Sequence, residues 1–113
     1  MADPERFERG LARDAANFQP LSPLGFLDWA AATFPDKLAV VDGDARYTYR
    51  AFAGRCRRLA GALIARGLGA GDVVSVLAPN SAPLLEAHYG VPLAGAVLNA
   101  LNTRLDAHTI AYI

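Results

Sequence analysis

Two short segments of the sequence have residue types that could hold a phosphate group. Gly67–Gly71 is rich in glycine, but it follows an expected helix and precedes an expected strand. A dinucleotide-binding loop has the opposite polarity, because the helix after it must point its N-terminus at the phosphates. Ala78–Ala82 has the correct polarity but contains neither glycine nor lysine. We therefore expect a helix stop and turn for the first segment, and a helix cap at Ser81 for the second.

The other reactive side chains lack the partners that catalysis needs. His88 could act as a general base, but its neighbours along the expected helix are mostly apolar, and Glu86 is expected on another side of that helix. A packed or interface histidine is the favoured interpretation. Cys56 shares an apolar helix face with Phe52 and Leu59. Burial there predicts an unreactive thiol.

Polar residues elsewhere are expected to have structural roles. The arginines between Arg50 and Arg66 are interpreted first as a solvated helix face, and second as a surface for phosphate or an acidic partner. Asn99 and Asn102 flank the end of a buried strand and are expected to satisfy loop backbone groups by hydrogen bonding, with a substrate role as the alternative. No Ser-His-Asp set, acid pair or metal-ligand spacing is found. The sequence predicts no catalytic, cofactor-binding or metal-binding residue in this chain.

Composition narrows the class of protein. The chain has 113 residues, of which 53% are apolar, with 11 basic and 11 acidic side chains. This apolar content indicates a folded core, and the balanced charge argues against a nucleic-acid partner. A single cysteine excludes an internal disulfide. The first twenty residues are rich in charge, which argues against a signal peptide. No apolar run is long enough to predict a membrane-spanning helix. A cytoplasmic protein is expected.

The elements that must position these residues follow from caps, turns and apolar periodicity. Ser22 and Thr48 are expected N-caps, Asp42-Gly43 a hairpin turn, and Gly67 a helix stop. The expected elements are a helix over 23–34, a hairpin over 38–48, a helix over 49–66, a strand over 73–78, a helix over 81–94, a strand over 96–101 and a helix after Asp106.

The two later strands and the helix between them predict a βαβ unit with parallel strands, so the fold class is α/β. Residues 73–78 are nearly all apolar, which predicts that both faces of that strand are covered. The side chains expected to point inward from the intervening helix are Leu84, Leu85, His88, Tyr89 and Leu93.

The two ends of the chain carry weaker patterns. Residues 1–16 are expected to form a peripheral segment, with a helix start at Asp3-Pro4. The last helix presents Ile110, Tyr112 and Ile113 with nothing after them to continue the layer. We therefore expect residues 17–113 to be the front part of a longer domain.

Four blocks follow one another along the chain: Pro20–Asp36, Tyr47–Tyr49, Asp72–Ser81 and Gly90–Leu105. In this order they resemble the N-terminal part of an AMP-forming acyl-CoA synthetase, in the adenylate-forming ligase superfamily. The last block ends on Asn99 followed by Asn102-Thr103-Arg104-Leu105. This ending resembles the short- and medium-chain fatty-acid branch, which includes ligases for acids such as methylmercaptopropionate.

This resemblance implies the N-terminal portion of the large AMP-binding domain. The full enzyme would use ATP and Mg²⁺ to convert a carboxylic acid into an acyl-adenylate and pyrophosphate, and then transfer the acyl group to coenzyme A. The phosphate loop and the catalytic lysine of the family lie downstream of Ile113, and Lys37 does not match that lysine. The resemblance therefore implies scaffold residues here and an inactive fragment.

An alternative interpretation is a stand-alone α/β module that binds a partner or forms a homo-oligomer. Its unfinished sheet and last helix would then bury their apolar side chains against a second copy.

Overall fold

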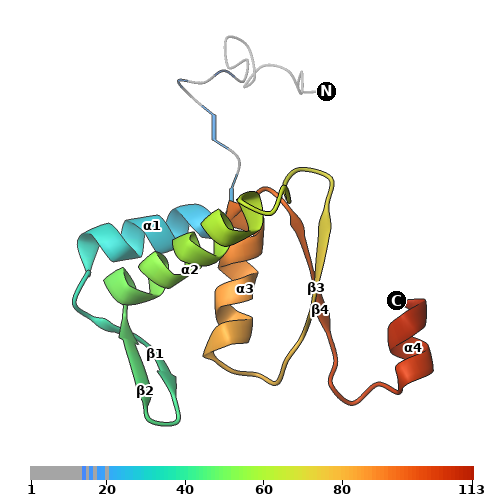
Figure 1. Cartoon of the computed structure of the whole chain (residues 1–113). Helices are drawn as coiled ribbons and strands as arrows, with labels where there is room; N and C mark the ends of the chain where they lie inside the picture. Colours follow the sequence, from blue (N-terminus) through green and yellow to red (C-terminus); the bar gives the residue numbers. More distant parts are fainter. Residues whose placement is uncertain (1–13, 15, 17, 20) are drawn as a thin grey trace, which may run out of the picture.

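The computed structural model describes residues 14, 16, 18–19 and 21–113, and the helix start expected at Asp3-Pro4 lies outside these residues. The elements alternate between helices and short strands (Figure 1). In chain order they are α1 Pro23–Thr33, β1 Leu38–Asp42, β2 Ala45–Thr48, α2 Tyr49–Ile64, β3 Val73–Leu77, α3 Ala82–Leu93, β4 Val97–Leu101 and α4 Ala107–Tyr112.

The predicted caps hold the ends of the helices. Ser22 Oγ accepts the backbone N–H of Leu24 at 3.3 Å, and Thr48 Oγ1 accepts that of Ala51 at 3.3 Å. Asp106 accepts both the N–H and the hydroxyl of Thr109. These short polar side chains satisfy N–H groups that have no partner within the helix. The caps predicted at Ser22 and Thr48 are confirmed, and Asp106 caps α4 in the same way.

The glycine-rich segment is a helix stop and turn, as predicted. Gly67 has a backbone φ of +82°, a conformation that residues with a Cβ rarely adopt. The N–H of Leu68 donates to the carbonyl of Leu63 at 3.1 Å, and that of Gly67 donates to Ile64 at 2.9 Å. This pair of bonds is a Schellman motif. In the turn that follows, Asp72 Oδ2 accepts the N–H of Gly69 at 2.8 Å.

Two separate two-stranded sheets complete the fold. β1 and β2 form the predicted antiparallel hairpin, and β3 and β4 pair in parallel with Val73 opposite Val97. Helix α3 connects the parallel strands, so the predicted βαβ unit is confirmed. In Figure 1 the helices α1, α2 and α3 lie close together on one side of the β3–β4 pair, while α4 lies beyond it.

The core sits between helices and against one face of the β3–β4 sheet. Helices α2 and α3 make the most extensive contact, and Phe52 and Tyr89 meet edge to face with ring centroids 5.5 Å apart. Gly90 lies directly under Leu59, where helix α3 approaches α2 closely. The buried apolar residues are Leu27, Val40, Phe52, Ala53, Cys56, Ala60, Ala82, Ala87, Val91, Ala94 and Ala96.

The prediction that both faces of the first parallel strand are covered is wrong for the described chain. Val74 and Val76 pack on the cluster formed by α3 and α2. Val73 and Leu77 point to the other face and are 60% and 54% exposed. The apolar run predicts burial on both faces, but the described residues supply helices to one face only.

The inward face predicted for α3 is also wrong in part. His88 and Leu85 are exposed, whereas Glu86 is buried. Apolar residues surround α3 on nearly every side, so their periodicity does not select a face. The observed inward positions Ala82, Glu86 and Gly90 are spaced by four residues, as one helix face requires.

Candidate functional site

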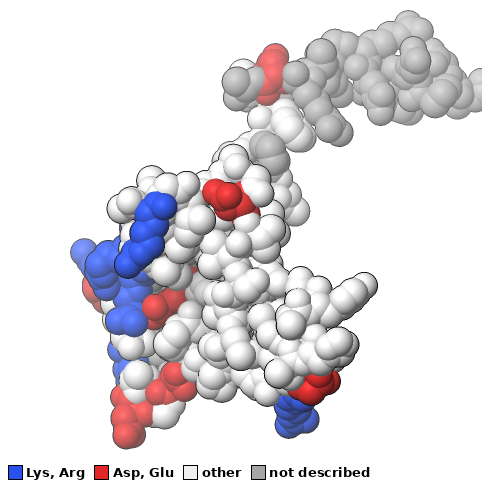
Figure 2. Space-filling model, turned by 45° about the vertical axis from the view of Figure 1, so that its right-hand side comes forward, with Lys and Arg blue, Asp and Glu red and all other residues white. Residues whose placement is uncertain are grey.

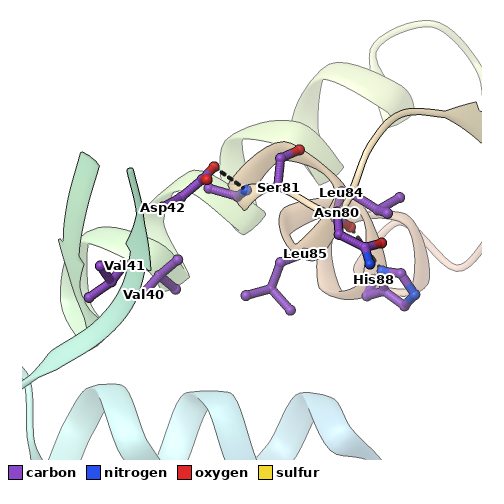
Figure 3. Close-up of a pocket in the computed structure, with 9 residues that line it drawn as sticks. Val40, Val41, Asp42, Asn80, Ser81, Leu84, Leu85 and His88 are labelled. Atoms are coloured by element: carbon purple, nitrogen blue, oxygen red, sulfur yellow. Dashed lines mark hydrogen bonds between the residues drawn. The ribbon is translucent and has the colours of Figure 1, made fainter. Parts of the chain in front are cut away.

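A cavity of about 330 Å³ lies where the hairpin meets the start of α3 (Figure 3). Its walls come from three elements: the end of β1, the loop after β3 and the first two turns of α3. Most of the lining is aliphatic, with a few polar groups at the rim, which is the usual composition of a small-molecule pocket. The lining residues are Val40, Val41, Asp42, Asn80, Ser81, Ala82, Leu84, Leu85 and His88.

The N-terminus of α3 is capped from a distant part of the chain. Asp42, at the end of β1, accepts the backbone N–H of Ala82 through Oδ2 at 2.7 Å (Figure 3). The predicted cap Ser81 occupies the N-cap position, but its side chain makes no capping bond and donates instead to the carbonyl of Pro79 at 2.9 Å. The expected side-chain cap at Ser81 is therefore wrong, because a carboxylate 40 residues away in sequence takes the helix N–H.

An Asp42→Ala substitution is expected to lower the free energy of unfolding by about 1 kcal/mol, the typical cost of losing a helix cap. The carboxylate also carries the charge that the helix N-terminus favours. Ser81→Ala is the matched control, and we expect it to change the free energy of unfolding by less than about 0.5 kcal/mol. Urea denaturation of both variants checks this, and an equal loss from both would contradict the assignment of the cap to Asp42.

A second cavity, of about 550 Å³, lies at the carboxyl ends of β3 and β4. It shares Asn80, Leu84 and His88 with the first cavity, so the two lie on either side of these residues. Ligands of open α/β sheets bind at this end of parallel strands. Its other walls are Ala78, Pro79, Ala100, Leu101, Asn102, Thr103 and Arg104.

The two asparagines near this cavity have structural partners, and the predicted bond to loop backbone is confirmed for Asn102 but not for Asn99. Asn99 donates through Nδ2 to Ser75 Oγ at 3.1 Å, which links the two parallel strands. Asn102 accepts the backbone N–H of Arg104 at 2.9 Å through Oδ1, which orders the loop after β4.

His88 lines both cavities but has no catalytic partner among the described residues. Its Nδ1 lies 2.8 Å from the carbonyl of Leu84, so this nitrogen donates and Nε2 remains available as an acceptor. The imidazole is exposed. A packed histidine is therefore not observed, and the geometry allows binding at the rim of a pocket.

Three arginines of α2, Arg50, Arg55 and Arg57, have acidic partners within the chain. Figure 2 shows most of the Lys and Arg in view on one side of the molecule with Asp and Glu beside them, and a smaller charged group at the lower right. Arg57 bonds Asp28 at 2.6 Å, and both side chains are more than half exposed. This observation favours the solvated face over a dedicated phosphate surface.

Arg55 differs from its neighbours, because it pairs with the buried Glu86 on α3. Nε of Arg55 donates to Oε1 of Glu86, and Nη2 donates to Oε2 at 3.3 Å. The guanidinium also lies 4.7 Å from the ring centre of Tyr47. The hydrogen bond to Glu86 raises the pKa of Arg55. This pair was not predicted from the sequence. The available signal was the spacing of Glu86, four residues after Ala82 and four before Gly90, which places the three residues on one face of the helix.

Cys56 is fully buried, as predicted. Loss of solvation raises the pKa of its thiol to about 11, so the reactive thiolate is scarce near neutral pH. Among the residues that the structure describes, no three His, Cys, Asp or Glu side chains converge on a common point. No described helix is long and apolar enough to cross a membrane. The described residues thus form pockets that could bind a ligand, without an arrangement for acid–base or nucleophilic chemistry.

Comparison with known proteins identifies the domain to which these elements belong. The family model described as "AMP-binding enzyme" matches residues 27–113. The acetate/butyrate–CoA ligase AAE7 of Arabidopsis thaliana is 48% identical over 103 residues, which cover 91% of this chain and 18% of that protein. The peroxisomal benzoate–CoA ligase of the same plant is also 48% identical over 103 residues.

A solved structure shows the same fold. The fatty acyl CoA synthetase of Mycobacterium tuberculosis superimposes with a TM-score of 0.74 at 35% identity, covering 79% of this chain and 18% of that chain. The chain thus spans less than one-fifth of the length of these two proteins. Because the family model matches well over half of its residues, this chain belongs to the AMP-binding enzymes and corresponds to the N-terminal portion of their acyl-CoA ligases.

Proposed function

We propose that this chain acts as part of an AMP-forming acid–CoA ligase. In that reaction the carboxylate of the acid attacks the α-phosphorus of ATP, pyrophosphate leaves, and an acyl-adenylate forms. The sulfur of coenzyme A then attacks the acyl carbon, and AMP leaves. The observation that carries the proposal is the 48% identity to an acetate/butyrate–CoA ligase across 91% of the chain.

The part proposed for the described residues is structural. They supply helices α1 to α3 and the parallel β3–β4 pair, whose carboxyl ends border the 550 Å³ cavity. Mg²⁺ would offset phosphate charge during adenylation. Among the residues that the structure describes, no three His, Cys, Asp or Glu side chains converge, and we assign none of them as a Mg²⁺ ligand.

We also propose the domain bounds, the substrate class and the location of the protein in the cell. We propose residues 17–113 as part of the AMP-binding domain and residues 1–16 as a peripheral segment. The substrate class is a short or medium-chain carboxylic acid, in keeping with the acetate and butyrate of the Arabidopsis ligase name. Benzoate is included among the acids to be tested, because one matched Arabidopsis protein is named a benzoate–CoA ligase. A cytoplasmic location competes with a peroxisomal one, because AAE7 is named a peroxisomal enzyme.

The native gene product should catalyse acid-dependent exchange between ATP and labelled pyrophosphate. We expect exchange with at least one of acetate, butyrate and benzoate. Labelled pyrophosphate enters ATP only by reacting with an acyl-adenylate, so exchange reports that this intermediate has formed. The 113-residue chain assayed alone should give the rate seen without acid. A native product of about 12.0 kDa that shows no exchange with any acid would contradict the proposal and favour the stand-alone module.

A further inference from the structure

A hollow of about 760 Å³ lies on the side of α1 opposite the buried Leu27. One of its lining residues is Gly25, which is inside the helix, where glycine is less favourable than alanine. No described atom comes within 4 Å of the place where a Cβ at Gly25 would lie. The described residues thus show no close contact that would explain a glycine here. This α1 hollow is lined by Gln19, Leu21, Ser22, Leu24, Gly25, Phe26, Asp28 and Trp29.

The walls of the α1 hollow are mostly apolar and exposed. Leu21, Phe26 and Trp29 are 90%, 62% and 60% exposed. Large apolar side chains gathered on one exposed surface indicate a site of contact with another segment or molecule. The one charged residue in the described lining, Asp28, already pairs with Arg57 at 2.6 Å. The α1 hollow is therefore suited to receive apolar side chains.

A second helix can approach α1 closely at Gly25, because no side chain there holds it away. The described chain contains such a contact elsewhere: Leu59 of α2 lies directly over Gly90, where α2 and α3 make their extensive contact. A helix laid across the α1 hollow would repeat this arrangement. The occupant expected from this comparison is an amphipathic helix with a large apolar side chain that faces Gly25.

The sequence before α1 supplies a segment with that pattern. Phe7 and Leu11 are one helical turn apart, and Asp3-Pro4 is the expected start of a helix. Residues 3–13 contain three acidic and three basic side chains, so the segment has no net charge. As a helix it would be about 16 Å long, which matches the 11 residues of α1.

A turn lies between this segment and α1. The N–H of Phe18 donates to the carbonyl of Asp14 at 3.0 Å, and Oδ1 of Asp14 accepts the N–H of Ala16 at 2.8 Å. A short connection of this kind allows two helices to lie antiparallel. Because the segment is joined to α1 through this connection, its effective concentration at the α1 hollow is on the order of millimolar. A second copy of the chain or another protein lacks that advantage.

We propose that residues 3–13 form a helix that docks antiparallel to α1, with Phe7 and Leu11 packed in the α1 hollow over Gly25. The docked segment covers Phe26 and Trp29. The proposal concerns a contact within this chain, so it stands or fails independently of the proposed ligase function.

The test uses the fluorescence of Trp29, which is the only tryptophan of the chain and lines the α1 hollow. Acrylamide quenching is compared between the unaltered 113-residue chain and the double variant Phe7→Ser with Leu11→Ser. The matched control is Glu5→Ser with Arg9→Ser. This control changes the opposite side of the same segment and leaves the net charge unaltered.

We expect the quenching constant of Trp29 to be at least about twofold higher in the double variant, because the undocked segment no longer shields the ring from acrylamide. The control variant should be quenched like the unaltered chain. Equal quenching in the unaltered chain and the double variant would overturn the proposal. Quenching of the unaltered chain that rises on dilution from about 100 to 1 µM would assign the α1 hollow to a second copy instead.

Trypsin cleavage after Arg13 gives a second readout that does not depend on fluorescence. Ala12 and Asp14, on either side of Arg13, are the same in all three proteins. A docked segment is cleaved only when it opens, so we expect cleavage at least about tenfold faster in the double variant than in the other two proteins. Equal cleavage rates would also overturn the proposal. If the double variant lacks a cooperative urea transition, Leu11→Ser alone replaces it, and the same directions are expected.

Discussion

Replacing Arg55 by alanine is expected to lower the free energy of unfolding by about 3 kcal/mol. Glu86 on α3 has a side chain only 10% exposed, so removal of its partner would leave a carboxylate in the interior without compensation. The Arg55 side chain is 36% exposed, which places the loss at the lower end of the range for buried pairs. The stacking of the guanidinium on Tyr47 would be lost as well.

Arg57→Ala is the matched control for this prediction. Arg57 lies on the same helix and pairs with Asp28, but both side chains are exposed, so we expect a loss of less than about 1 kcal/mol. The double variant Arg55→Met with Glu86→Leu should recover most of the loss, since it removes the stranded charge. Urea denaturation gives all three values. Equal losses for Arg55→Ala and Arg57→Ala would show that the Arg55–Glu86 pair contributes no more than a surface pair.

Gly90→Ala is expected to destabilise the chain by about 2 kcal/mol, although alanine is normally the better helix residue. A Cβ built at Gly90 lies 2.7 Å from Cδ2 of Leu59, 2.9 Å from Cγ and 3.0 Å from Cβ. The methyl end of Leu59 can rotate away, but its Cβ is fixed to helix α2. Three contacts this short place the overpacking cost near the upper end of its usual range, at about 3 kcal/mol, and the helix propensity gain of about 1 kcal/mol leaves a net loss of about 2 kcal/mol.

Gly61→Ala provides a control with the opposite sign. Gly61 lies within α2, and a Cβ added there meets nothing within 4 Å. We expect stabilisation of about 0.5–1 kcal/mol from reduced backbone freedom alone. Adding Leu59→Ala to Gly90→Ala should cost less than the sum of the two single changes, because it removes the clashing atoms. Thermal or urea denaturation checks the signs; stabilisation by Gly90→Ala would contradict the close approach of α2 and α3.

The elements that the sequence predicts well are those whose signals are local. Ser22, Thr48 and Asp106 each cap a helix that begins at the next residue, and Gly67 ends α2 through its own backbone conformation. The hairpin turn and the alternation of strand, helix and strand are equally local. Short-range hydrogen bonds and backbone preferences decide these features, so neighbouring residues are enough to predict them.

The errors concern contacts between distant segments. Asp42 displaces the expected Ser81 cap, and nothing in the residues around Ser81 indicates a carboxylate from the hairpin. The pairing of Arg55 with Glu86 depends on how α2 crosses α3. The exposure of Val73 depends on which face of the β3–β4 sheet the helices cover. In each case the local pattern is compatible with two outcomes, and tertiary packing selects one of them.

In the candidate site, too, the features with local signals are predicted and those that depend on distant contacts are not. Apolar helix-face reasoning correctly predicts the burial of Cys56, and the bond to loop backbone is correctly expected for Asn102, whereas Asn99 bonds Ser75 on the neighbouring strand instead. The pockets around His88 could not be predicted, because they form where β1, α3 and the loop after β4 meet. Those three segments are far apart along the chain.

A chimera, in which this chain's residues replace the 103 matched residues of the Arabidopsis ligase AAE7, tests most directly whether this chain works as the N-terminal portion of an acid–CoA ligase. The measurement is its acid-dependent ATP–pyrophosphate exchange. We expect exchange with acetate or butyrate within about tenfold of the unaltered plant enzyme, a difference of about 1.4 kcal/mol in barrier. A folded chimera that exchanges pyrophosphate no faster with acid than without it would contradict the account.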